Sequence, residues 1–278
     1  MSSRCLLVVD ADRSMHERLS SLLRRDDRSI QDAYDGREAL ECLRHRAFDL
    51  VLAGQGTNGD DGLKLLRSMR ALRPGTKVIV TGEADPARAL GAIRQRAFSY
   101  FHKPIPELAL ADTVQQALDA ASWQDDIRVI SARPEWITLD IRCKIGAAER
   151  ATQIVHEVEP DLPAQVREDV SAAFRELLMN AIEHGGKSDP KKRVRASLIR
   201  TARSMMVHIH DPGKGFSLDF LPHAAISNPD GSPTRHVEER LGQGLRPGGF
   251  GILMTRNLVD ELLYNERGNA VLFVKYLT

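Results

Sequence analysis

One segment in the second half of the chain pairs a carboxylate with an amide at a spacing that suits nucleotide chemistry. Glu176 and Asn180 lie four residues apart in a stretch with helical periodicity, so they share one face of a helix. The amide oxygen of Asn180 can bind Mg2+, and a carboxylate one turn away can orient or deprotonate a nucleophile. The alternative is a plain solvated pair on the helix surface.

A second segment, HDPGKGF, follows an alternating strand pattern and begins at His210. An acid at the end of a strand, here Asp211, can accept a hydrogen bond from an exocyclic amine such as that of adenine. Gly213 and Gly215 allow the backbone to approach a planar base, because glycine has no side chain. The segment therefore suits base recognition.

A third segment, RPGGFGIL, leads into a helical pattern and contains Gly248, Gly249 and Gly251. Glycines at a helix N-terminus present free N–H groups and the positive end of the helix dipole to a phosphate. Residues 216–247, which precede it, are rich in Gly, Pro, Asn and Ser. A loop of this length inside a compact domain is usually a lid or a disordered segment.

The first 122 residues alternate between short apolar runs and helical patterns, which predicts an α/β fold with five strand–helix units. Strands that are apolar throughout and separated by helices favour a doubly wound, five-stranded parallel sheet with helices on both faces. The expected strands cover residues 5–10, 30–34, 50–53, 77–81 and 100–101, and the expected helices cover 15–23, 36–45, 62–70, 87–94 and 107–121.

The pattern changes after a predicted linker at residues 123–134. The remaining residues, 135–278, predict an α+β sandwich that contains the long loop. Its expected strands cover 136–144, 193–200, 204–211 and 270–277, and its expected helices cover 147–158, 165–184 and 251–263. The chain is therefore predicted to hold two domains joined by a short connector.

Four groups of residues near the predicted carboxyl ends of the parallel strands resemble the receiver domains of bacterial response regulators. They are VVDAD at 8–12, DLVLAG at 49–54 with DDG at 60–62, VIVTG at 78–82 and YFHKP at 100–104. The resemblance implies that Asp10, Thr81, Tyr100 and Lys103 are remnants of the receiver site.

Two of the three carboxylates that the receiver family uses are missing here. Ala11 stands where the second acid of the Mg2+ pair is expected, and Gly54 stands at the position of the phospho-acceptor Asp. The resemblance therefore implies a receiver-like domain that lacks a phospho-acceptor and serves a structural or docking role. The alternative is that Asp12, one place beyond the acidic pair, restores metal binding.

The three segments of the second half, in this order, resemble the Bergerat-type ATPase fold of gyrase, Hsp90, sensor kinases and mismatch-repair proteins. ELLMNAIEHGG and the ending LVDELLYNERGNAVLFVKYL resemble the branch of anti-sigma-factor serine/threonine kinases. This implies ATP and Mg2+ as cofactors, with Asn180 as the Mg2+ ligand, Asp211 as the adenine reader and Glu176 as the general base. Gly213 and Gly215 would line the base pocket, and Gly248, Gly249 and Gly251 would hold the phosphates. Ala270 departs from the branch, which usually has Thr there.

Two functions fit these residues. The first is an ATP-dependent kinase that acts on an anti-anti-sigma-type protein and binds a sigma factor or a second copy of the chain. The second is a non-catalytic, ATP-gated binding switch, which would tolerate loss of Glu176. A sensor histidine kinase fits less well, because about a dozen residues separate the halves and His156 lies inside the second half.

Composition narrows the classes further. The net charge of +1 argues against a nucleic-acid partner. The sequence shows no apolar stretch long enough to span a membrane and no signal peptide. Its three cysteines are scattered, which fits a reducing cytoplasm. We therefore expect a cytoplasmic protein that acts on other proteins.

Overall fold

The computed structural model of the chain describes residues 3–54, 62–215 and 251–277. The chain divides into two compact units, the first of residues 1–124 and 153–161, the second of residues 125–152 and 162–278. Across the described residues, none of the helices has the length and apolar character that crossing a membrane requires.

The first unit is built on a five-stranded parallel sheet, as predicted. The strand order is β2-β1-β3-β4-β5, and every strand pair is parallel. The strands are β1 (Arg4–Val9), β2 (Arg28–Ala33), β3 (Leu50–Ala53), β4 (Lys77–Gly82) and β5 (Ser99–His102). All four residues of β3 are buried, which explains its continuous apolar sequence.

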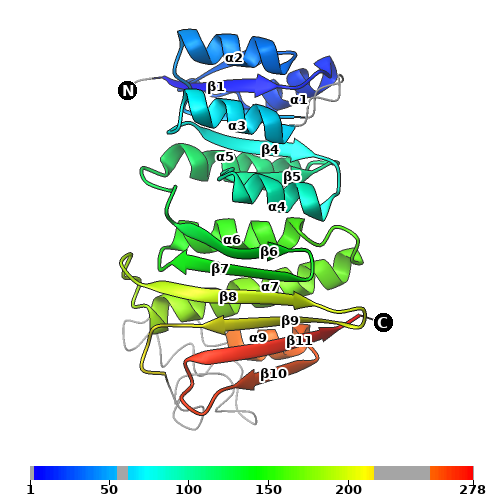
Figure 1. Cartoon of the computed structure of the whole chain (residues 1–278), viewed down its shortest axis with the longest axis vertical. Coiled ribbons are helices and arrows are strands. Elements are labelled where there is room, and N and C mark those ends of the chain that lie inside the picture. Colours follow the sequence, from blue (N-terminus) through cyan, green and yellow to red (C-terminus); the bar gives the residue numbers. More distant parts are fainter. Residues whose placement is uncertain (1–2, 55–61, 216–250, 278) are drawn as a thin grey trace. The chain divides into compact units, whose positions relative to one another are not determined.

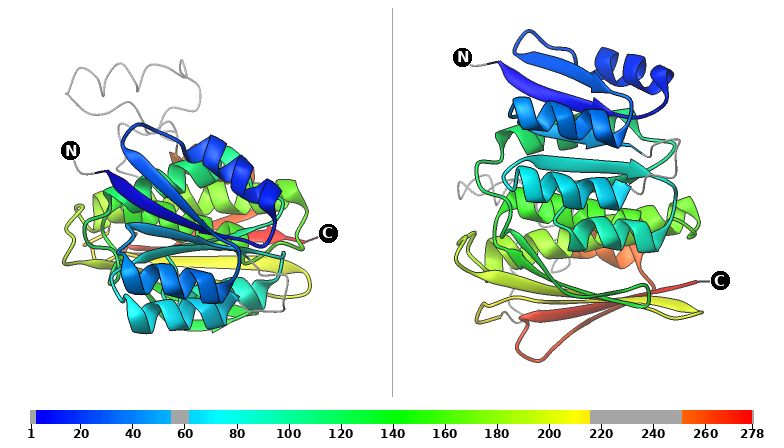
Figure 2. Two further views of the ribbon diagram at one scale, coloured as in Figure 1. Left: turned by 90° about the horizontal axis from the view of Figure 1, so that it is seen from above. Right: turned by 45° about the horizontal axis from the view of Figure 1, so that its top comes forward.

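Five helices cover the two faces of this sheet, with α1 and α5 on one face and α2, α3 and α4 on the other (Figures 1 and 2). They are α1 (Arg13–Leu23), α2 (Gly36–His45), α3 (Gly62–Leu72), α4 (Pro86–Arg94) and α5 (Glu107–Asp119). Asp12, Asp35 and Asp85 each accept a backbone N–H from the first turn of the helix that follows. These caps place the helix starts just after the strand ends.

The second unit is built on a six-stranded antiparallel sheet with the order β10-β11-β9-β8-β7-β6. Its strands are β6 (Ile127–Arg133), β7 (Trp136–Arg142), β8 (Arg193–Arg200), β9 (Ser204–His210), β10 (Glu261–Tyr264) and β11 (Ala270–Tyr276). Helices α7 (Ala164–Asn180) and α9 (Gly251–Leu258) pack on one face of it, and α6 (Ile145–Glu157) precedes them (Figure 1). Residues of β8 alternate between buried and exposed, as expected for a sheet covered on one face.

The predicted linker at 123–134 is wrong in its second part, because Ile127–Arg133 form strand β6. This strand pairs antiparallel with β7, and Ala132 faces inward with 5% exposure. A register shift between Val129 and Ser131 interrupts the alternation. That β-bulge obscured the strand pattern in the sequence.

The predicted helix at 251–263 is also wrong in its second part, because α9 ends at Leu258 and residues 261–264 form β10. The backbone N–H of Asp260 donates to the carbonyl of Val274 at 2.9 Å, and Leu262 pairs with Phe273. Pairing with β11 therefore overrides the local helical periodicity.

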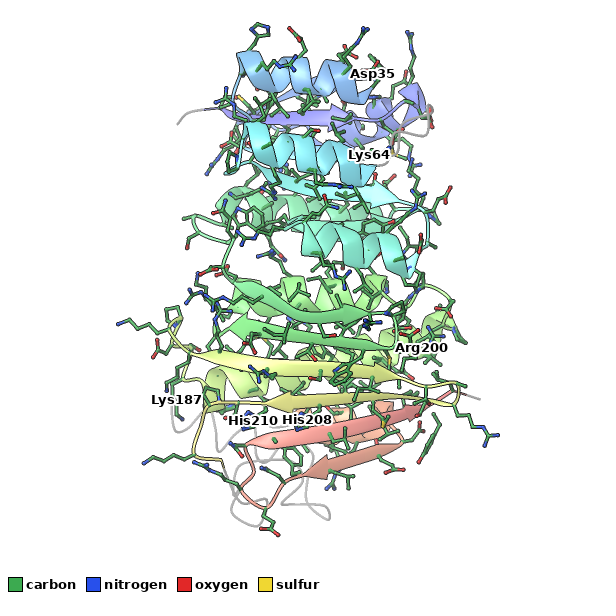
Figure 3. The ribbon with its side chains drawn as sticks, viewed as in Figure 1. Asp35, Lys64, Lys187, Arg200, His208 and His210 are labelled. Carbon is green, nitrogen blue, oxygen red and sulfur yellow. The ribbon has the colours of Figure 1, made fainter. Side chains whose placement is uncertain are left out.

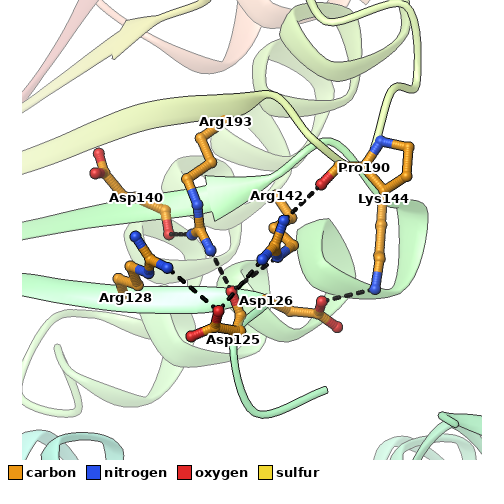
Figure 4. Close-up of polar contacts among 8 residues, drawn as sticks. All are labelled: Asp125, Asp126, Arg128, Asp140, Arg142, Lys144, Pro190 and Arg193. Atoms are coloured by element: carbon orange, nitrogen blue, oxygen red, sulfur yellow. Dashed lines mark hydrogen bonds and ion pairs between the residues drawn. The ribbon is translucent and has the colours of Figure 1, made fainter. Parts of the chain in front are cut away.

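Residues just before β6 are fixed to the second unit by a charged network (Figure 4). Arg142 donates to the carbonyl and the carboxylate of Asp125, each at 3.2 Å, and to the carbonyl of Pro190 at 2.8 Å. Lys144 donates to Oδ1 of Asp126 at 2.8 Å. The connector is thus anchored where it enters the sheet.

Candidate functional site

Asp10 and Lys103 form an ion pair at the carboxyl end of the parallel sheet. Asp10 follows β1 and Lys103 follows β5, and Oδ2 of Asp10 lies 3.1 Å from Nζ of Lys103. The Asp10 side chain is only 4% exposed, and its Oδ1 accepts the N–H of Asp12 at 3.0 Å. Both oxygens of this carboxylate are therefore engaged within the first unit.

Gly54, at the end of β3, lies directly against this carboxylate. Its N–H donates to the carbonyl of Val9 at 2.6 Å. A Cβ at position 54 would overlap Oδ2 of Asp10 and would lie 2.8 Å from its Cγ and 3.0 Å from the Val9 carbonyl. The carboxylate of Asp10 thus occupies the space in which a side chain at position 54 would begin.

Asp12 is engaged by the first turn of α1. Its Oδ1 accepts the N–H of Ser14 and its Oδ2 accepts the Ser14 hydroxyl, both at 2.9 Å. These hydrogen bonds hold the pKa of this exposed carboxyl below its usual range. The structure therefore assigns Asp12 a helix-capping role.

Thr81 and Tyr100, the other two receiver-type residues, are both buried near the ends of β4 and β5, at 4% and 2% exposure. The hydroxyl of Tyr100 donates to the carbonyl of Glu83 at 2.6 Å. Burial raises the pKa of Tyr100 to about 12. The phenol is therefore a neutral donor that ties β5 to the segment after β4.

His16 also lies in this region, although nothing in the sequence indicated its contacts there. It is 4% exposed, its Nδ1 lies 2.8 Å from Oδ1 of Asp32, and its Nε2 lies 2.7 Å from the carbonyl of Asp10. Tyr34 packs on its ring with centroids 4.6 Å apart. A single His in an amphipathic helix does not predict these buried hydrogen bonds, because one of them depends on contact with Asp32 of β2.

In the second unit, Glu176 and Asn180 lie on α7, as predicted, and are half-buried. The helix does not continue regularly to residue 184. Ala181–Gly185 form a π-helical turn, in which the N–H of Gly186 donates to the carbonyl of Ala181 at 2.8 Å. Such turns widen a helix locally and are frequent at functional sites. Periodicity alone did not reveal this one.

Asp211 meets the end of this π-helical turn. A Cβ on Gly185 would overlap the carboxylate of Asp211, and one on Gly213 would lie 2.8 Å from Cα of Gly185. Oδ1 of Asp211 accepts the N–H of Gly213 at 2.7 Å. Figure 3 labels His210, which precedes Asp211, near the end of β9. The first and second sequence segments are therefore in contact, and glycine is required where they meet.

The electrostatic environment of Asp211 is mixed. Burial raises the pKa of its carboxyl, whereas the Gly213 N–H and the nearby His210 and Arg267 act in the opposite direction. Since the raising effect dominates, this carboxylate is less stable in its charged form than an ordinary one. A partner that donates a hydrogen bond to it would relieve part of that cost.

Glu176 lies against Gly251, in the described part of the third segment. A Cβ on Gly251, the first residue of α9, would overlap Oε1 of Glu176. The carboxylate thus lies at a helix N-terminus, where the dipole favours negative charge. Thr255 is fully buried and donates to the carbonyl of Gly251 at 2.8 Å, which fixes the first turn.

Of the remaining predicted residues, the structure describes Gly215 and Ala270 but not Gly248 and Gly249. Gly215 has a φ of +83°, and a Cβ there would overlap the carbonyl of Arg267, so the position requires glycine. Ala270 begins β11 and donates its N–H to Oδ1 of Asn265 at 3.0 Å. Gly248 and Gly249 lie outside the described residues, so their phosphate-binding role stays a prediction, as do the other ligand roles.

Comparisons with known proteins divide the chain in the same way. The model of the response regulator receiver domain matches residues 6–115, and the model of the histidine kinase-like ATPase domain matches residues 143–275. Receiver-domain structures from Methanospirillum hungatei and Pseudomonas fluorescens are 24% and 29% identical, each with a TM-score of 0.40. They cover 42% and 43% of this chain, and 95% and 89% of their own chains.

Curated relatives include transcriptional regulatory protein ZraR of Escherichia coli, 27% identical over 205 residues, which are 72% of this chain and 45% of that protein. Response regulator protein FleR of Pseudomonas aeruginosa is 35% identical over 115 residues, 41% of this chain and 24% of that protein. The chain therefore spans less than half the length of these relatives. Together, the two sheets and the two matched models establish that the chain joins a response regulator receiver domain to a histidine kinase-like ATPase domain.

Proposed function

We propose that the chain is a bacterial signalling regulator whose C-terminal half binds Mg2+-ATP and phosphorylates a serine or threonine of an anti-anti-sigma-like protein. The observation that supports this most strongly is the contact between the first and second segments, where Asp211 packs against Gly185. The contact between Glu176 and Gly251 adds the third segment. In this proposal, three segments far apart in sequence supply the base, metal and phosphate contacts.

The described residues suit this ligand. In this proposal the half-buried carboxylate of Asp211 accepts a hydrogen bond from the exocyclic amine of adenine, and the glycines beside it allow the loop to pack closely around that carboxylate. Asn180, directly before the π-helical turn, offers an amide oxygen to Mg2+. In this proposal the N-terminus of α9 binds the phosphates. The phosphate-binding role of Gly248 and Gly249 stays a prediction, because both lie outside the described residues.

Phosphoryl transfer then requires positioning and charge neutralisation. Bound Mg2+ supplies neutralisation of the phosphate charge. Glu176 accepts the proton of the attacking serine or threonine hydroxyl, whose oxygen bonds to the γ-phosphorus while the bond to the β–γ bridging oxygen breaks and ADP leaves. The N-terminus of α9 lies beside Glu176, where the helix dipole favours a negative charge.

The receiver half controls the kinase without being phosphorylated itself. Gly54 has no carboxylate to accept a phosphoryl group, and Asp10 fills the adjacent space while pairing with Lys103. We infer that this half is a docking module that responds to a partner. The protein partners we propose are an anti-anti-sigma-type protein, a sigma factor and a second copy of the chain.

The test is capture of the partner from a bacterial extract with the full chain in the presence of ATP and Mg2+, followed by mass analysis of the captured protein. A phosphoserine or phosphothreonine that appears with wild-type protein and is lost with Glu176→Gln supports the kinase. A partner whose capture depends on ATP but which gains no phosphate would contradict it, and would identify the ATP-gated binding switch instead.

A further inference from the structure

The turn between β10 and β11 is closed by its own asparagines. Oδ1 of Asn265 accepts the N–H groups of Asn269 and Ala270, each at 3.0 Å, and Nδ2 of Asn265 donates to Oδ1 of Asn269 at 2.9 Å. The N–H of Gly268, whose φ is +73°, donates to the carbonyl of Asn265 at 2.9 Å. The turn therefore has a defined shape, and Asn265 holds Asn269 in place.

Asn269 in turn holds the end of β9. Its carbonyl accepts the N–H of Asp211 at 3.0 Å. Its Nδ2 lies 3.2 Å from Nε2 of His210 and 3.5 Å from the carbonyl of Asp211. The side chain is buried, with 7% of the residue exposed. Both backbone polar groups of Asp211 therefore face one residue of the turn.

The same turn also holds Lys214 and Gly215, where the described part of the loop after β9 ends. Nε of Arg267 donates to the carbonyl of Lys214 at 3.2 Å, and the carbonyl of Arg267 lies against Cα of Gly215. Residues 211–215 are thus braced by the turn at both ends. The braced loop includes Asp211 and Gly213, whose contact with Gly185 leaves little freedom for the carboxylate.

We propose that Asn269 is a positioning residue that fixes the Asp211 carboxylate for adenine and thereby sets the preference of the site for adenine over guanine. This inference rests on the proposed ATP-binding function. An adenine amine donates to the carboxylate, whereas guanine presents a carbonyl at the same ring position. A carboxylate held in one place rejects that carbonyl, because both groups would be left without a donor. A loosened loop lets the carboxylate turn away and lowers the discrimination.

The experiment is a calorimetric titration of the full chain with the non-hydrolysable analogues of ATP and GTP in the presence of Mg2+. Asn269→Ala removes the side-chain contacts but keeps the backbone carbonyl. We expect its affinity for the ATP analogue to fall about tenfold, as for the loss of one to two buried hydrogen bonds. We expect a smaller fall for the GTP analogue, so that the ratio of the two affinities narrows. Asn257→Ala, the same change at an exposed position of α9, should leave both affinities unchanged.

The outcomes separate this inference from the function on which it rests. If wild-type protein binds neither analogue, the proposed ATP site itself is wrong. If Asp211→Asn loses the ATP analogue while Asn269→Ala binds both analogues like wild type, the site stands and the positioning role is wrong. If Asn269→Ala does not fold, Asn265→Ala tests the same brace from outside the loop contact, and an unchanged ratio of affinities there would equally overturn the inference.

Discussion

The carboxylate of Asp10 stands against Gly54 so closely that a Cβ at position 54 would overlap its Oδ2 atom. Position 54, where we predict the acceptor of a receiver domain, therefore has neither a carboxylate nor room for one. Nζ of Lys103 lies 3.1 Å from the same Oδ2 atom and forms an ion pair with this buried carboxylate.

The first prediction concerns this position. Wild-type protein incubated with a small phosphodonor and Mg2+ should gain no phosphoryl group on residues 1–122, as measured by intact mass and peptide mapping. A labile gain of one phosphoryl group in that region would refute the docking role of the receiver half.

An acidic side chain introduced at position 54 should lower the stability of the fold. Gly54→Asp is expected to destabilise the chain by about 1–3 kcal/mol, because the new side chain is forced into an occupied space. The Asp10→Ala background removes the obstacle, so the same substitution should cost less there. Urea unfolding of the four proteins measures the coupling, and equal costs in both backgrounds would show that Asp10 does not block the position.

The second prediction follows from the raised pKa of Asp211. A carboxyl whose pKa is raised by folding contributes stability below its unfolded pKa, and that contribution is lost as pH rises through the folded value. At neutral pH the ionised carboxylate of Asp211 therefore lowers the free energy of unfolding of the ligand-free protein. We expect Asp211→Asn to melt at an equal or higher temperature than wild type at pH 7.

The melting temperatures of wild type and Asp211→Asn should therefore be compared over a range of pH. The difference in melting temperature should shrink as pH falls through the raised pKa of Asp211, because wild type then becomes protonated and resembles the variant. A variant that is less stable than wild type at pH 7 and equally so in acid would mean that Asp211 is stabilising, contrary to its burial.

The third prediction separates chemistry from binding. Glu176→Gln keeps the size of the side chain but removes its basicity, so partner phosphorylation should fall by about 10²- to 10⁴-fold with little change in ATP affinity. Asn180→Ala should instead weaken Mg2+-ATP binding itself, because a metal ligand is lost. Measured single-turnover rates and calorimetric affinities for both variants decide this. Equal losses of ATP affinity in Glu176→Gln and Asn180→Ala would contradict the assignment of Glu176 as the base and Asn180 as the Mg2+ ligand.

The fourth prediction concerns the anchored connector. Arg142 joins Asp125 to Pro190 through three hydrogen bonds, so Arg142→Met should destabilise the chain by about 1–3 kcal/mol. Arg128 contacts the same Asp125 carboxylate at 3.2 Å but from an exposed position, so Arg128→Met should cost less than about 1 kcal/mol. Chemical unfolding of both variants would contradict the anchoring role if the two costs were equal.

Much of this architecture could be predicted because its signals are local. Apolar runs separated by helical patterns indicated the parallel sheet, and the order of acids and glycines indicated two sites at strand ends. Strand β6 was missed because its bulge breaks the alternation, and β10 because pairing with β11 decides its state. The roles of His16 and Asn269 depend on contacts across 16 and 59 residues of sequence. Neither has a local signature.

The central claim, an ATP site read by Asp211, is tested most directly by calorimetric titration of the full chain with a non-hydrolysable ATP analogue and Mg2+. Three proteins are compared: wild type, Asp211→Asn, and Asp26→Asn, which makes the same change at an exposed residue of the first unit. We predict that wild type and Asp26→Asn bind alike and that Asp211→Asn binds at least about tenfold more weakly, as for the loss of a hydrogen bond to a charged group. Binding by Asp211→Asn with the affinity of wild type would contradict the account.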